Sequence, residues 1–124
     1  MEENIKNQRI PIWIALSEFY LDTELDESDF DRIANKIKAS PYSFDEVKKI
    51  NKYEVFPVLG YNLLDVAGEW AGFDETWLID SILKSIEKKN LFKKIVVEIT
   101  FLFFKSMCKD YWINLEKAFI KINN

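Results

Sequence analysis

Turn-forming residues are scarce in this chain, and their scarcity limits the folds open to it. The 124 residues include only three glycines and three prolines. A sandwich or barrel of short strands needs a turn roughly every 8–12 residues. The sequence therefore favours a few long elements, which is typical of helices. With 48% apolar residues and this length, the chain is predicted to bury one core and to form a single domain over residues 1–124.

Helix boundary signals support this interpretation. Ser43 and Glu46 have the spacing of a capping box, in which each side chain bonds the backbone N–H of the other residue. Asp74 is a good N-cap before another apolar stripe. Apolar residues at three- and four-residue spacing predict helices over residues 10–22, 28–39, 43–55, 63–70, 74–88 and from 110 onward. The expected fold class is all-α, a compact bundle of about five to seven helices.

Three boundary residues give more specific expectations. Pro11 suits the first turn of the opening helix, because a missing N–H costs least there. Ser28 is the predicted N-cap of the second helix, with Asp29 and Asp31 in its first turn. Pro57 is expected to kink or end the helix that starts near Ser43.

Residues 91–107 are the hardest part of the chain to interpret. They are so apolar that no period stands out, and the β-branched residues over 95–101 would also suit a short strand. The length of the run and the lack of turn residues favour a helix. Its densest part, Ile95 to Phe104, is about half as long as a bilayer span. We expect this part to lie in the buried core.

Residues with catalytic side chains are few. The chain has no histidine and one cysteine, Cys108. This excludes imidazole bases, Ser–His and Cys–His nucleophiles, and most zinc and haem ligand sets. Cys108 lies among apolar residues and is expected to be buried. There is no glycine-rich phosphate loop. The chain is therefore interpreted as a non-enzymatic binding protein without cofactor or metal.

Six carboxylates occur within ten residues of one acidic segment. Read as a calcium loop from its first Asp, the segment fails, because Glu27 replaces the required Gly and Ile33 replaces the bidentate Glu. Two interpretations stay open, a solvated turn before a helix or an acidic surface for a basic partner. The candidate partner-binding residues here are Asp22, Glu24, Asp26, Glu27, Asp29 and Asp31.

A second candidate lies in residues 66–74, where two of the three glycines flank Glu69 and Trp70. Small residues allow backbones to approach closely, so the segment suits a tight helix junction. Alternatively, Glu69 and Trp70 form the wall of a partner-binding groove, since Trp is common at interface hot spots.

Charge is distributed unevenly along the chain. Residues 1–83 have a net charge of −9, residues 84–124 a net charge of +5, and the whole chain −4. The overall acidity disfavours nucleic acid, and the lysines of the second part are scattered without any Arg. The polar N-terminus is unlike a signal peptide. We expect a cytoplasmic protein that binds neither nucleic acid nor membrane.

Several strings occur in an order that resembles a family of small uncharacterised bacterial proteins, a domain of unknown function. The most specific are Leu-Asp-Thr-Glu-Leu at residues 21–25, Ser-Pro-Tyr-Ser at 40–43 and Val-Ala-Gly-Glu-Trp-Ala-Gly-Phe at 66–73. The resemblance covers about residues 9–83, and the lysine-rich part from residue 84 falls outside it. No activity is assigned to the family, so the resemblance implies no catalytic residue.

By type alone, small acidic helical bacterial proteins without histidine are similar to the immunity proteins of contact-dependent and polymorphic toxin systems. This analogy implies binding to a cognate toxin with a basic surface. Two alternatives from other classes stay open: a small carboxylate-dependent enzyme that uses magnesium, and a homo-oligomeric structural or regulatory protein. The oligomeric state is left open.

Overall fold

The computed structural model describes residues 1–21, 24–60, 73–88 and 90–123. The all-α fold class is confirmed, since no strand forms within these ranges. The helices are α1 (Glu3–Ser17), α2 (Glu27–Ala39), α3 (Phe44–Ile50), α4 (Phe56–Leu59), α5 (Glu75–Glu87), α6 (Leu91–Phe104) and α7 (Lys109–Ile122). The helix expected over 63–70 lies outside the described residues.

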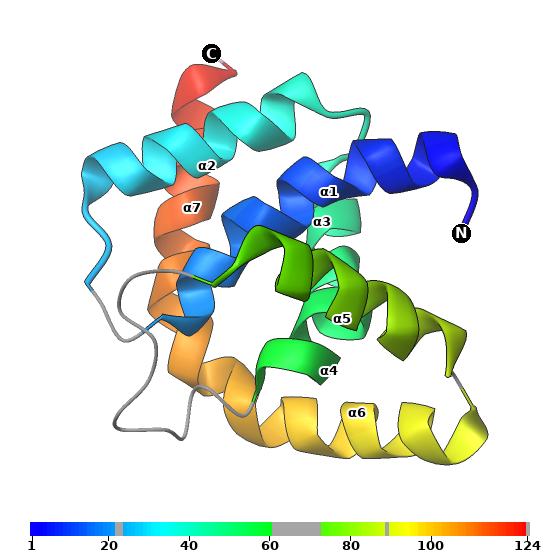
Figure 1. The fold of residues 1–124 in the computed structure, drawn as a ribbon. Coiled ribbons are helices and arrows are strands. Elements are labelled where there is room, and N and C mark those ends of the chain that lie inside the picture. The colour runs from blue at the N-terminus through cyan, green and yellow to red at the C-terminus, as the bar shows by residue number, and fades with distance from the viewer. Residues whose placement is uncertain (22–23, 61–72, 89, 124) are drawn as a thin grey trace.

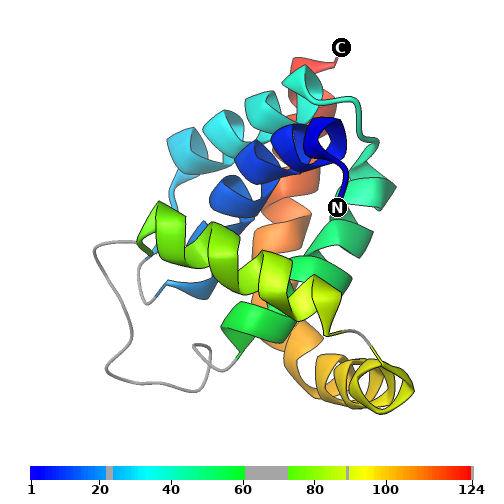
Figure 2. The same ribbon diagram turned by 45° about the vertical axis from the view of Figure 1, so that its right-hand side comes forward.

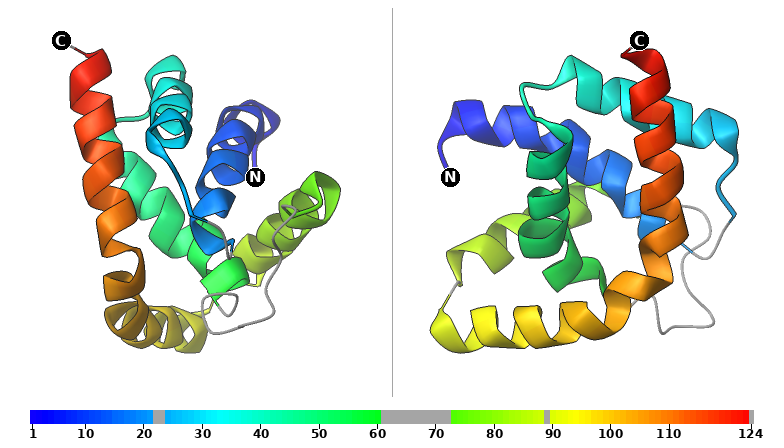
Figure 3. Two further views of the ribbon diagram at one scale, coloured as in Figure 1. Left: turned by 90° about the vertical axis from the view of Figure 1, so that its left-hand side faces the viewer. Right: turned by 180° about the vertical axis from the view of Figure 1, so that it is seen from behind.

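Helix α1 is central in the arrangement. Figures 1 and 3 show it between α2 and α5, with α2 also packed on α7. A 3₁₀ turn (Glu18–Tyr20) continues α1, and its Phe19 ring contacts the rings of Tyr111 and Trp112 with centroids 5.3 and 5.2 Å apart. Helix α6 lies at the opposite end of the molecule from α2 (Figures 1 and 2). The core therefore surrounds α1, and α6 borders it.

Pro11 is not at a helix start, contrary to expectation. Helix α1 begins at Glu3 and contains Pro11 in its interior. Proline removes the hydrogen bond that its N–H would donate to the carbonyl of Asn7. Both Pro11 and Asn7 are exposed, so water can solvate that carbonyl. The loss is tolerated because it falls on the solvent side of the helix.

The N-cap of α2 is also displaced from its expected position. Asp26, not Ser28, caps the helix, and its carboxylate accepts a hydrogen bond from the backbone N–H of Asp29 at 3.0 Å. The Asp29 carboxylate accepts one in return from the N–H of Asp26, also at 3.0 Å. Asp and Ser are equally good caps, so the choice depended on backbone conformation. The capping box at Ser43 and the N-cap at Asp74 are confirmed.

Pro57 was expected to kink or end the helix that starts near Ser43, and the structure has a change of helix type just before it. Helix α3 widens into a π turn (Asn51–Val55) directly before α4, which has Pro57 in its first turn. A proline ring would clash with the carbonyl four residues earlier, here that of Tyr53. The π turn replaces the regular hydrogen bonds between residues four apart with bonds between residues five apart directly before this proline. The strand considered near 95–101 is wrong, since these residues belong to α6.

The two candidate caps of α2 can be compared directly. We expect Asp26→Ala to lower the free energy of unfolding by about 1 kcal/mol, because it leaves the Asp29 N–H without its acceptor. Ser28→Ala should change it by less than about 0.5 kcal/mol, since Ala is a good helix former. Urea unfolding followed by circular dichroism measures both. A larger loss for Ser28→Ala would contradict the assigned cap.

Candidate functional site

The predicted acidic segment is largely paired within the chain. Asp26 and Asp29 cap α2, and hydrogen bonds from Ser28 and the Asp29 backbone hold the pKa of the Asp26 carboxyl below its usual value. Arg32 contacts Asp29 at 3.0 Å and Glu18 at 2.6 Å. These contacts neutralise part of the negative charge and give Asp26 and Asp29 a role in helix formation.

The remaining residues of the segment differ in position. Lys121 of α7 contacts Asp31 at 2.9 Å and Glu27 at 3.4 Å. Glu27 is 86% exposed and Glu24 is also exposed, so both carboxylates face solvent. Three of the predicted partner-binding residues, Asp22, Glu69 and Trp70, lie outside the described part of the chain. Their predicted role remains a prediction.

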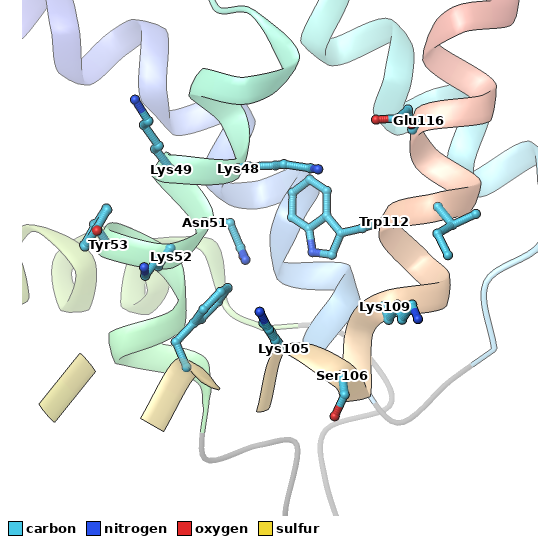
Figure 4. A pocket seen from close by; sticks show the side chains of 12 residues that line it. Lys48, Lys49, Asn51, Lys52, Tyr53, Lys105, Ser106, Lys109, Trp112 and Glu116 are labelled. Carbon is cyan, nitrogen blue, oxygen red and sulfur yellow. The ribbon is translucent and has the colours of Figure 1, made fainter. Parts of the chain in front are cut away.

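The sequence did not indicate a groove that the structure shows (Figure 4). One of its walls is formed by α3 and the π turn, and the other by α7 and the 3₁₀ turn before it (Lys105–Cys108). Its volume is about 780 Å³. We call it the lysine groove, because five lysines line it. The lining residues include Lys48, Lys49, Asn51, Lys52, Tyr53, Phe101, Lys105, Lys109, Trp112, Ile113 and Glu116. Lysines that seemed scattered in the sequence therefore meet at one site.

One wall of the groove is fixed by three hydrogen bonds, of which the one between Tyr20 and Asn51 is buried. The Tyr20 hydroxyl donates to Asn51 Oδ1 at 2.6 Å. Two residues on, Tyr53 donates to a Glu98 carboxylate oxygen at 2.7 Å, and Lys52 contacts the same carboxylate at 2.8 Å. Residues 51–53 thus join the 3₁₀ turn after α1 to α6, and the same residues form part of the wall.

The second candidate surface is on α6, and it corrects the expectation that Ile95 to Phe104 is buried. Only Val97 of this helix is buried. Successive residues of a helix are about 100° apart, so the exposed apolar residues share one arc of about 140°, which we call the outer arc. Exposed by 38% to 76%, they are Leu91, Phe92, Ile95, Val96, Ile99, Leu102 and Phe103.

Two polar residues of α6, Lys93 and Glu98, contact the rest of the protein instead. Lys93 Nζ donates to the Ser85 hydroxyl at 3.1 Å, and Glu98 accepts from the π turn. Phe101 completes the inner side, with its ring 5.1 Å from the Phe56 ring. The usual orientation of an amphipathic helix, apolar side inward, is partly reversed here.

Other candidate chemistry is limited within the described residues. Cys108 is buried, as expected, and burial raises the pKa of its thiol to about 11. A thiolate is therefore rare at neutral pH. No group of three or more Cys, Asp or Glu side chains is arranged to hold a metal ion in the described ranges. None of the helices described is both long enough and apolar enough to cross a membrane.

Comparison with known proteins gives one match. Residues 7–118 match the family described as a domain of unknown function, DUF7079. The chain belongs to this family. No curated protein and no solved structure matches it. The DUF7079 match extends into α7, so the expectation that the part from residue 84 falls outside the family is wrong. Both walls of the lysine groove and the outer arc lie within the matched range.

Two sequence signals could have led to the lysine groove. The first is the net charge of +5 over residues 84–124, which shows an excess of lysines in this part of the chain. Lys48 with Lys52, and Lys105 with Lys109, have the four-residue spacing that places side chains on one side of a helix. Nothing in the sequence indicated that these two sides face each other.

The contacts of Glu98 in α6 with Lys52 and Tyr53 of the π turn predict that the stability of the fold depends on pH. Hydrogen bonds from Lys52 and Tyr53 lower the pKa of Glu98. A lowered pKa stabilises the fold above the ordinary carboxyl pKa, and this contribution is lost as pH falls below about 4. We expect Glu98→Gln to lower the free energy of unfolding at pH 7 and to reduce its decrease between pH 7 and pH 3.

Urea unfolding at both pH values measures this effect. Glu87→Gln is the control, since Glu87 is exposed and forms no ion pair with any described residue. It should keep the wild-type pH dependence. The assignment is contradicted when Glu98→Gln shows the same decrease as the control.

Proposed function

We propose that this protein acts by binding another protein through the outer arc of α6, without catalysing a reaction. The observation that carries the proposal is the exposure of seven large apolar side chains on one 14-residue helix. Contiguous apolar surface of this kind on a soluble domain marks an interaction site. Burial of these side chains against a partner would supply the main favourable free energy of binding.

The position of α6 supports this function. The helix lies at one end of the molecule (Figures 1 and 2), so a partner can reach it. Its inner side is held by Glu98, Lys93 and aromatic packing, so the outer arc is presented on a fixed element. A preformed surface loses less conformational entropy on binding than a flexible one.

The chemistry of the arc and of the whole chain describes the partner. The outer arc contains no charged residue, so the facing surface must be apolar. The protein has a net charge of −4, which attracts a basic partner and opposes association with a second copy. The exposed carboxylates of Glu24 and Glu27 would add to this attraction.

We further propose that the partner is a toxin domain and that this protein is its immunity protein. The proposal rests on the type of molecule: small, acidic, all-α, without histidine, and with a surface suited to a partner. An immunity protein needs only to cover the toxin, so it requires no catalytic residue of its own. Self-association through the outer arc is the second candidate, because two copies of an uncharged apolar stripe are complementary.

We expect Ile99→Asp with Leu102→Asp to abolish protection in a co-expression assay. The toxin to test is the C-terminal domain of any large secreted protein that a neighbouring gene encodes. Wild-type protein should restore growth, and purified proteins should form a complex. Two buried carboxylates would weaken that complex at least about tenfold by calorimetry, because each would lose its hydration without a partner.

The matched control is Thr76→Asp with Asn114→Asp, which adds the same two charges at exposed positions of α5 and α7. It should protect and bind like wild type. Equal loss in both variants contradicts the role of the outer arc. A wild-type dimer in sedimentation that Ile99→Asp with Leu102→Asp converts to a monomer favours self-association, and wild-type failure to protect against the neighbouring domain contradicts the immunity proposal.

A further inference from the structure

We propose that the lysine groove is a binding site for a small organic phosphate. This inference is separate from the protein-binding function, because it concerns other residues and another class of ligand. It rests on hydrogen-bond donors that point into the groove, on the charge of its walls, and on its size.

The first observation is a buried donor directed into the groove. Asn51 is 3% exposed. Its Oδ1 accepts from Tyr20, and burial raises the Tyr20 pKa well above its usual value, so this hydroxyl keeps its proton. The amide is thereby oriented with Nδ2 toward the groove (Figure 4). Nδ2 donates to no acceptor among the described residues, which leaves it free for a ligand.

Further donors surround this amide. Figure 4 shows the indole of Trp112 in the middle of the groove, with Lys48 and Lys105 reaching toward it from two sides. Trp112 Nε1, Lys48 Nζ and Lys105 Nζ have no hydrogen-bonded acceptor in the described part of the chain. An amide N–H₂, an indole N–H and two ammonium groups can only donate. Their natural ligand atoms are the oxygens of an anion.

The charge of the walls fits the same ligand. Lys49 and Lys109 add two further cations to the lining, whereas Glu116 is its one carboxylate. Lys52 is already paired with Glu98. The other four lysines face one acid, Glu116, and in a chain of net charge −4 they create a local positive potential that attracts a multivalent anion.

Phosphate suits this geometry better than a carboxylate. The donors come from both walls of the groove, and they do not form the planar fork that matches a carboxylate. The oxygens of a tetrahedral phosphate accept from several directions at once, and lysine is a common phosphate ligand. A phosphate also brings up to two charges to one point.

The size and floor of the groove indicate an organic part beside the phosphate. Small-molecule sites have volumes of roughly 300–1,000 Å³ and mostly apolar walls, and this groove measures about 780 Å³. Phe101, Ile113 and the ring of Tyr53 line it. A smaller void of about 30 Å³ adjoins the groove, and Asn51, Lys105 and Trp112 line both spaces. A flat or aliphatic group can cover these rings while the phosphate meets the donors.

The test uses the full-length protein with four probes in calorimetry at low salt: adenosine diphosphate, inorganic pyrophosphate, citrate and a single-stranded oligonucleotide. We expect adenosine diphosphate and pyrophosphate to bind with a Kd below about 1 mM, at least tenfold more tightly than citrate, and more weakly as salt increases. No binding of either phosphate, or equal binding of citrate, overturns the proposal. A single-stranded oligonucleotide that binds more tightly than adenosine diphosphate overturns it in favour of nucleic acid.

Matched variants locate the site. Lys48→Gln with Lys105→Gln should weaken pyrophosphate binding at least tenfold. Lys36→Gln with Lys84→Gln makes the same change of charge at exposed positions of α2 and α5, and it should bind like wild type. Equal weakening in the two variants would show attraction by overall charge alone and would overturn the site.

Two further variants test the fixed donors. Asn51→Asp keeps the acceptor for Tyr20 but replaces the donor with a negative charge, so it should abolish binding. Trp112→Phe removes the indole N–H and retains an aromatic ring beside Phe19 and Phe44, and it should weaken binding about threefold to tenfold. Thermal unfolding identifies variants that fail to fold. Unchanged binding in a folded Asn51→Asp or Trp112→Phe variant overturns the assignment.

Discussion

The rest of the structure depends on the π turn over residues 51–55. Consecutive side chains of this turn form hydrogen bonds with different parts of the molecule. Asn51 accepts from Tyr20, and Lys52 and Tyr53 donate to Glu98 of α6. Glu54 accepts from Arg9 and from the indole of Trp13, both in α1. A regular α-helix places successive residues about 100° apart and would point them differently. The widened turn therefore holds α1 and α6 on one helix and shapes a wall of the lysine groove.

This arrangement explains how an apolar helix can be fixed and exposed at once. Helix α6 is held by polar contacts through Glu98 and Lys93 and by aromatic packing on its inner side, so its outer arc is not needed for the core. Burying the outer arc in the core would increase the free energy of unfolding, so its exposure does not serve the stability of the fold. The outer arc and one wall of the groove lie on the C-terminal part of the chain, which carries the positive charge, whereas α3 and the π turn form the other wall. The two proposed sites thus share one supporting framework and can be tested independently.

Local sequence signals predicted the helices well. Most of the predictions that were wrong concerned features that depend on tertiary packing. The capping box at Ser43 and the cap at Asp74 were predicted correctly, because a cap depends on neighbours within one turn. Pro11 was misplaced, since only the packing of α1 shows that its solvent side tolerates a missing bond. For the candidate site, the acidic segment was recognised, but its pairing with Arg32 and Lys121 involves residues 3 to 94 positions away. The outer arc and the lysine groove were not predicted as sites.

By itself, the sequence determined the fold class, most helix boundaries and the lack of imidazole chemistry, because these follow from composition and from contacts within a few residues. It also fixed which side chains share a side of each helix, through the helical period. Only the tertiary structure decided which side of α6 faces solvent and which lysines meet across a groove. Periodicity groups residues on one side of a helix, whereas burial of that side depends on elements distant in the chain.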